Sequence, residues 1–163
     1  MFILRIVAPV CRYRQPIQSI SDRLLVARVH EVVPKAVWVQ RYREINDFER
    51  MLNGNGVKIL KFFLYISKDE QKKRFEARIN EPEKNWKFST SDVAERKYWD
   101  DYMRAFEDAI NHCTTAQAPW FVIPANKKWF RNLAVSGVIV EAMEEMKMHL
   151  PKPNANLSKI QFE

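Results

Sequence analysis

Glycine is scarce in this chain, which has only three among its 163 residues: Gly54, Gly56 and Gly137. Loops that cradle phosphate through the backbone need closely spaced glycines, and the sequence contains no Gly-x-x-x-x-Gly-Lys segment. These 163 residues therefore contain no phosphate-binding loop of that type.

Cysteine and histidine are also few. The two cysteines, Cys11 and Cys113, cannot build a disulfide framework, and neither belongs to a Cys-x-x-Cys or Cys/His pattern typical of structural zinc. None of the three histidines is close in sequence to a cysteine or serine in a nucleophile setting, so a catalytic nucleophile–histidine pair is not indicated. A reducing, cytoplasmic setting is the expectation.

Long apolar runs are missing too. No uninterrupted apolar stretch approaches the roughly 20 residues that a membrane helix needs, so no membrane partner is expected. The apolar start of the chain, residues 1–8, contains Arg5 and lacks a basic leading segment, which argues against a signal peptide.

Positive charge is what the sequence has in excess. Lys and Arg number 27 against 20 Asp and Glu, which gives a formal net charge of +7. Such a surface favours an anionic partner, although a basic protein without a polyanionic ligand fits the same count. With 47% hydrophobic and 29% charged residues, the chain has the balance of one globular domain.

The hydrophobic pattern predicts an α/β chain. Strands are expected at residues 2–8, 57–66 and 119–124, and helices at residues 23–32, 34–52, 67–79, 91–111 and 128–148. The stretch 57–66 is almost continuously apolar, which is typical of a parallel strand covered on both faces. Ser67 is the expected cap of the helix that follows, and Glu70 completes a capping box.

Basic residues gather on the helix expected after that strand and on the loop behind it. Arg74 and Arg78 lie four residues apart and therefore share one helix face, while Lys84 and Lys87 follow in the loop. Because guanidinium groups bind phosphate oxygens in paired hydrogen bonds, this segment is a candidate lid over a phosphate chain. A solvated helix face with pairs such as Glu70–Arg74 explains the same spacing and is the simpler interpretation.

A second basic cluster follows the last expected strand and contains Asn126, Lys127, Lys128 and Arg131. Ligands of parallel sheets lie beyond the carboxyl ends of strands, and helix N-termini attract anions. These residues are therefore candidate phosphate ligands. The alternative is that the two aromatic residues between Lys128 and Arg131 are core residues with lysines around them.

Several strings of unusual composition run through the middle of the chain. They are Arg28-Val29-His30, Val33-Pro34-Lys35, Ile45-Asn46-Asp47-Phe48-Glu49, Ile59-Leu60-Lys61-Phe62-Phe63-Leu64, Ile66-Ser67-Lys68, Pro82-Glu83-Lys84-Asn85-Trp86-Lys87-Phe88, Trp99-Asp100-Asp101-Tyr102-Met103, Ala118-Pro119-Trp120, Val122-Ile123-Pro124-Ala125 and Lys128-Trp129-Phe130-Arg131-Asn132-Leu133. Together they resemble the polyphosphate kinase 2 family over about residues 24–150. The chain then divides into an N-terminal segment, 1–21, without this resemblance, a related domain, 22–150, and a polar tail, 151–163.

The resemblance implies a three-layer P-loop kinase fold like that of thymidylate kinase, with a parallel sheet flanked by helices. It also implies phosphoryl transfer between inorganic polyphosphate and nucleotides, with magnesium as the cofactor. The residues that it places over polyphosphate, in the lid, are Arg74, Arg78, Lys84 and Lys87. Those that it places near the nucleotide or its phosphates are Arg28, Asn126, Lys127, Lys128 and Arg131.

The family's phosphate loop and its Asp-Arg-Ser motif have no counterpart here, since Asp22-Arg23 is followed by Leu24. We therefore expect the C-terminal part of such a kinase, as a truncated product or one piece of a split protein, without the P-loop half and without turnover alone. No catalytic residue and no metal ligand is assigned. The alternative is a non-catalytic polyanion-binding or assembly module. Missing strands would leave the central strand partly uncovered and favour self-association, and no specific nucleic-acid partner is expected.

Overall fold

The computed structural model describes residues 3–7 and 21–149, with side chains described from Leu24 onward. The elements in chain order are β1 (Ile3–Val7), a π-helical segment η1 (Ser21–Val26), α1 (Ala27–Val29), α2 (Lys35–Gly54), β2 (Ile59–Tyr65), α3 (Lys68–Asn80), the 3-10 helix η2 (Pro82–Lys87), α4 (Thr90–Glu95), the 3-10 helix η3 (Arg96–Tyr98), α5 (Trp99–Cys113), β3 (Trp120–Pro124) and α6 (Lys128–Glu145). The predicted α/β class is confirmed.

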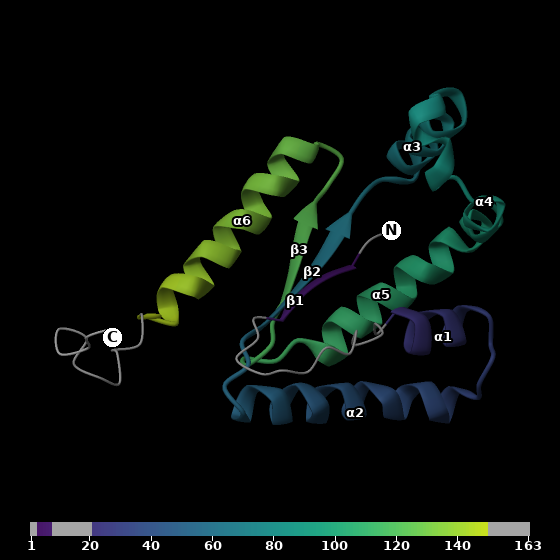
Figure 1. The fold of residues 1–163 in the computed structure, drawn as a ribbon. Helices are drawn as coiled ribbons and strands as arrows, with labels where there is room; N and C mark the ends of the chain where they lie inside the picture. Colours follow the sequence, from purple (N-terminus) through teal and green to yellow (C-terminus); the bar gives the residue numbers. More distant parts are fainter. Residues whose placement is uncertain (1–2, 8–20, 150–163) are drawn as a thin grey trace, which may run out of the picture.

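The three described strands form one sheet in the order β1-β2-β3 (Figure 1). β2 and β3 are parallel, with Phe62 opposite Phe121, and this confirms the predicted parallel pairing. β1 is different, because it runs antiparallel to β2, with Leu4 opposite Phe62. The sheet is therefore mixed rather than purely parallel.

Helices cover both faces of the sheet and make three layers (Figure 1). α6 packs on one face, where Leu60, Phe62 and Ile123 form a core with Ala142. On the other face, Phe63 belongs to a core with residues of α2 and α5. β2 is thus covered on both faces, as its apolar sequence predicts.

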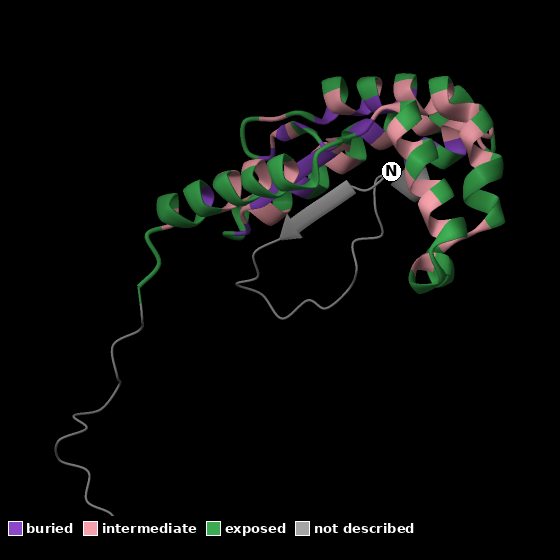
Figure 2. Ribbon diagram, turned by 90° about the horizontal axis from the view of Figure 1, so that it is seen from above, coloured by how far each residue is buried: buried purple, intermediate pink, exposed green. Residues whose placement is uncertain are grey.

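The expectation that missing strands leave the central strand partly uncovered applies only to the carboxyl end of β2, where Leu64 is half-buried and Tyr65 is 42% exposed. The residues from Ile59 to Phe63 are all buried, and Figure 2 shows buried residues in purple within the described part of the sheet. β1 and β3 occupy its two edges, so its backbone is paired on both sides. Exposed apolar side chains include Val122 of β3, which is 55% exposed, and a stripe on α6.

Two predicted helices differ in detail. The helix expected at residues 91–111 is broken into α4, η3 and α5, because side chains at the break bond to other elements instead of continuing one helix face. The helix expected at residues 23–32 is replaced by η1 and the short α1. The ends of the strand predicted at 2–8, most of the N-terminal segment 1–21 and the tail 151–163 lie outside the described residues.

Among the described helices, none is both long enough and apolar enough to cross a membrane.

Candidate functional site

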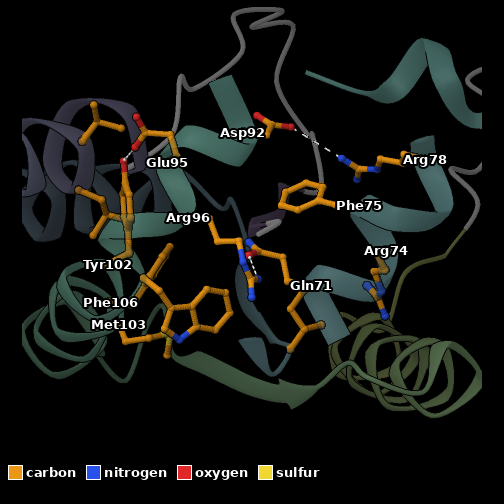
Figure 3. Close-up of a pocket in the computed structure, with 14 residues that line it drawn as sticks. Gln71, Arg74, Phe75, Arg78, Asp92, Glu95, Arg96, Tyr102, Met103 and Phe106 are labelled. Atoms are coloured by element: carbon orange, nitrogen blue, oxygen red, sulfur yellow. Dashed lines mark hydrogen bonds and ion pairs between the residues drawn. The ribbon is translucent and has the colours of Figure 1, made fainter. Parts of the chain in front are cut away.

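A pocket of about 350 Å³ lies beyond the carboxyl end of β2, where α3, α4 and α5 meet (Figure 3). Ligands of parallel sheets commonly bind at this end of the strands. The lining residues are Leu25, Val26, Ile66, Gln71, Arg74, Phe75, Arg78, Asp92, Glu95, Arg96, Trp99, Tyr102, Met103 and Phe106.

The start of α3 is fixed by its cap and by the loop after β3. Ser67 Oγ accepts a hydrogen bond from the Glu70 amide at 3.2 Å, which confirms the predicted N-cap. The second half of the predicted capping box does not form, because the Ser67 amide donates to Asn126 Oδ1 at 3.0 Å. The Glu70 carboxylate instead accepts from Arg74 Nε at 2.8 Å. The lid helix is therefore tied at its base to the second basic cluster.

Arg74 strengthens this connection. Its Nη2 donates to the Ala125 carbonyl at 2.8 Å and to the Asn126 carbonyl at 3.3 Å, while its Nε faces Glu70. The side chain is 23% exposed, so most of it is out of water. The structure thus brings together two residues that the sequence places in separate clusters, Arg74 and Asn126.

Two further arginines connect α3 to the α4–η3 segment across the pocket. Arg78 Nη1 lies 3.7 Å from Asp92 Oδ2, and the Arg78 side chain is 20% exposed. Arg96 Nη1 donates to the Lys68 carbonyl at 2.8 Å and to Gln71 Oε1 at 2.9 Å. Together with Arg74, they place three guanidinium groups in the pocket lining, beside the carboxylates of Asp92 and Glu95.

The opposite side of the pocket is apolar and aromatic. Figure 3 shows Tyr102, Met103 and Phe106 facing the side that carries Arg74 and Arg78. Phe106 is anchored in the core, where its ring centroid lies 4.7 Å from that of Phe63. An apolar wall opposite a cationic wall suits a ligand with a flat ring at one end and an anionic group at the other.

Glu95 accepts two hydrogen bonds, from His30 Nε2 at 2.9 Å and from the Tyr102 hydroxyl at 2.8 Å. Burial by itself would raise the pKa of Glu95, but the hydrogen bonds from His30 and Tyr102 outweigh it and hold this pKa below its usual range. Burial, and then the hydrogen bond to the Glu95 carboxylate, raise the pKa of Tyr102 well above its usual range. At neutral pH the pair is therefore a carboxylate and a neutral phenol.

Arg28, a predicted nucleotide or phosphate ligand, lies outside the pocket lining. Its Nη2 is 2.6 Å from Asp108 Oδ2 and its Nη1 donates to the Tyr42 hydroxyl at 3.2 Å. The guanidinium also lies 4.6 Å from the centroid of the Trp38 ring. These contacts join α1 to α2 and α5, so Arg28 has structural partners in this state.

The remaining predicted basic residues also lie outside the lining: Lys84, Lys87, Lys127, Lys128 and Arg131. Lys84 forms an ion pair with Glu81, and the Lys87 ammonium lies 4.7 Å from the centroid of the Trp86 ring. Of the predicted lid residues, Arg74 and Arg78 reach the pocket. The binding roles of the whole set stay predictions.

The sequence patterns missed Arg96 and the aromatic wall as parts of a site. Arg96 falls inside the stretch predicted as one long helix, where an arginine is an ordinary surface residue. Its partner Gln71 is 25 residues away, so no local spacing links the two. The apolar stripe of Trp99, Tyr102, Met103 and Phe106 is visible in the sequence, but as core rather than as a pocket wall.

Magnesium has no resident set of protein ligands among the described residues. Among residues 3–7 and 21–149, no group of three or more His, Cys, Asp or Glu side chains is arranged to hold a metal ion. The two carboxylates in the pocket, Asp92 and Glu95, already face Arg78 and His30 respectively. Magnesium is therefore implied by the family resemblance alone, and we derive no chemical step through it.

These layers and this pocket define an α/β protein with an arginine-lined, partly aromatic cavity at the carboxyl end of a parallel strand pair. The family described as Polyphosphate kinase 2 (PPK2) matches residues 15–151, which is most of the chain. The protein belongs to the polyphosphate kinase 2 family.

Similar proteins agree with this assignment. An AMP/ADP-polyphosphate phosphotransferase from Meiothermus ruber is 51% identical over 146 residues, which are 90% of this chain and 55% of that protein. The crystal structure of polyphosphate kinase 2 from Arthrobacter aurescens TC1 has 45% sequence identity and a TM-score of 0.80 over 83% of this chain and 48% of that one. The chain thus spans about half the length of these relatives. A shorter relative, an uncharacterized protein in the chlN 3' region of Leptolyngbya boryana, is 56% identical over 71% of this chain and 85% of its own length.

Proposed function

We propose that this chain carries the lid and the nucleotide-binding wall of a polyphosphate:nucleotide phosphotransferase of the thymidylate kinase-like P-loop type. The observation that carries the proposal is a pocket lined by Arg74, Arg78 and Arg96, in which the side facing α3 is aromatic. The relatives named above include an AMP/ADP-polyphosphate phosphotransferase, which acts on ligands of this chemistry.

Each half of such a ligand matches one wall. A guanidinium offers several N–H donors in a fixed plane and binds two phosphate oxygens at once. A purine or pyrimidine ring packs well against Trp99 and Phe106, since aromatic stacking excludes water from both surfaces. Both pocket carboxylates have cationic or hydrogen-bonded partners, which reduces their repulsion toward a phosphate.

We expect no turnover from the 163-residue chain alone. Phosphoryl transfer depends on positioning and on neutralising charge, and a Gly-x-x-x-x-Gly-Lys loop does both in P-loop enzymes. The chain has no such loop. Purified chain with magnesium, polyphosphate and ADP or AMP should therefore form nucleotide product at the rate of a blank, measured by chromatography of the nucleotides.

A second experiment asks whether adding the missing part of such an enzyme produces activity. The part of the Meiothermus ruber enzyme that this chain does not match, added as a separate chain, should produce activity that neither part has alone. Activity of the 163-residue chain by itself, after removal of host kinases, would contradict the proposed division of labour.

The alternative function is a non-catalytic module that binds polyanions or assembles with longer homologues. The net charge of +7 favours it as much as it favours the enzyme part. The two differ in nucleotide binding. The pocket predicts saturable binding of ADP or AMP, whereas a general polyanion binder would bind polyphosphate and ignore the ring.

Self-association is a further proposal, and it concerns α6. Trp129, Leu133, Val140 and Met143 lie within one stripe of this helix and are 67%, 64%, 51% and 49% exposed. Apolar stripes of this kind favour association. We expect the apparent mass in sedimentation velocity to rise with concentration, and the variant Leu133→Gln/Val140→Gln to remain monomeric at concentrations where the parent chain associates. Identical behaviour of the two would contradict a role for this stripe.

A further inference from the structure

Three polar side chains from three elements meet at one end of the pocket. His30 follows α1, Glu95 ends α4 and Tyr102 lies on α5. The His30 ring nitrogen and the Tyr102 hydroxyl both donate to the same oxygen, Glu95 Oε2, and lie 3.5 Å from each other. Figure 3 shows the Glu95 and Tyr102 side chains pointing toward each other at the edge of the aromatic wall. One carboxylate thus joins α4 to both α1 and α5.

The same short segment is bound to the lid helix on its other side. Arg96, the next residue, donates to the Lys68 carbonyl and to Gln71 of α3. Asp92, one helical turn before Arg96, faces Arg78 of α3. The segment from Asp92 to Arg96 therefore connects the lid helix to the body of the domain, in addition to the contacts of Arg74 with the loop after β3.

We infer that Glu95 positions the segment from Asp92 to Arg96 at the pocket, and that protonation of His30 strengthens its hydrogen bond to Glu95. We call this arrangement of His30, Glu95 and Tyr102 the latch. The inference uses the proposed function only to say what the pocket binds. The contacts of Glu95 stand whether or not the ligand is a nucleotide. His30, Glu95 and Tyr102 are positioning residues in this scheme, because they act on the pocket through Arg96 and Asp92.

The direction of the pH effect follows from the chemistry of the donors. An imidazole gains its proton as the pH falls through the histidine range, and a charged donor makes a stronger hydrogen bond to a carboxylate than a neutral one. The Tyr98 ring lies 4.8 Å from the imidazole and the Lys97 ammonium lies over that ring. The pKa of Glu95 is lowered and that of Tyr102 is raised, so neither of these two side chains changes its charge near neutral pH. The latch is tight on the acidic side and loosens as the pH rises.

Hydrogen exchange of the whole chain, followed by mass spectrometry, tests this without any ligand. Peptides from residues 90–98 are compared at about pH 6 and about pH 8, with exchange times scaled for the intrinsic rate and with α6 peptides as the internal reference. We expect about twofold to fivefold more protection at the lower pH, the range of a partly exposed ion pair. His30→Gln, which keeps a donor but cannot titrate, should abolish this difference.

The matched control is His112→Gln. His112 lies at the end of α5, stacked on Tyr42 with ring centroids 4.7 Å apart, and its Nδ1 faces a backbone carbonyl rather than a carboxylate. This variant should keep the parental difference between the two pH values. If His30→Gln does not fold by circular dichroism, Glu95→Gln replaces it, with the same expected loss. No pH difference in the parent, or an unchanged difference in the His30 or Glu95 variant, would overturn the inference.

Binding of inorganic tripolyphosphate separates this inference from the proposed function. At about pH 6, Glu95→Gln should weaken binding about twofold to fivefold in calorimetry, because Arg78 and Arg96 lose their fixed positions. If the exchange result holds but tripolyphosphate does not bind the parent chain, the latch stands and the proposed function fails. If tripolyphosphate binds but His30→Gln leaves the pH difference in the exchange of residues 90–98 unchanged, the latch is wrong and the proposed function stands.

Discussion

Glu49→Gln should lower the free energy of unfolding by about 3–5 kcal/mol, the cost of breaking a buried ion pair by removing one partner. Lys61 and Glu49 are 0% and 2% exposed, in the middle of β2 and on α2. The Lys61 ammonium donates to Glu49 Oε2 and to the Cys113 carbonyl, each at 2.6 Å. The substitution keeps the shape of the side chain but removes the negative charge of Glu49 that faces the ammonium in a site that excludes water.

Urea unfolding followed by circular dichroism measures this effect, and two variants serve as controls. Asp47→Asn, on the same helix, removes an exposed carboxylate that faces Arg43 and Arg50, and should cost less than about 1 kcal/mol. The double variant Lys61→Met/Glu49→Leu removes both charges and should come within about 1 kcal/mol of the parent or exceed it. Equal stabilities of Glu49→Gln and Asp47→Asn would contradict the prediction.

The Lys61–Glu49 pair shows a kind of contact that sequence patterns do not predict. Lys61 interrupts an apolar run, and Glu49 falls on the apolar face of a predicted helix, so both positions are expected to be buried. The pattern says nothing of their contact, because it joins a strand to a helix through the fold rather than through local spacing. The same limit explains β1, since its antiparallel edge pairing with β2 leaves no periodic signal in either strand.

The site could be predicted in part for the same reason. Helical spacing places Arg74 and Arg78 on one face, and both line the pocket. Asn126 is a predicted phosphate ligand whose side chain bonds to Ser67 at the base of the lid, and its binding role stays a prediction. Arg96 was not predicted, because nothing local in the sequence reveals that the helix breaks at η3 and turns this side chain toward α3. Local rules thus predict which residues share a face, and the fold decides what that face meets.

The variant Arg74→Gln/Arg78→Gln should weaken polyphosphate binding by roughly a hundredfold, if the lid closes over the phosphates as proposed. The two side chains are 23% and 20% exposed, so their hydrogen bonds to phosphate form largely out of water. A hydrogen bond to a charged group in such a place contributes about 1.5 kcal/mol or more, and two lost bonds together give about 3 kcal/mol. The substitution also leaves the Glu70 and Asp92 carboxylates without their arginines, and these would then repel the phosphate chain.

Isothermal calorimetry with polyphosphate at one fixed salt concentration measures this loss, since salt weakens every contact between charges. The control is Arg43→Gln/Arg50→Gln on α2. This variant also removes two positive charges, but from side chains that are 88% and 70% exposed. It should weaken binding less than about fivefold, because exposed charges act on the ligand through water. Hydrogen exchange of α3 checks that the lid is still formed, since Arg74 also bonds to the loop after β3. If the two double variants lose the same affinity, α3 acts only through its net charge and the assignment of the lid is wrong.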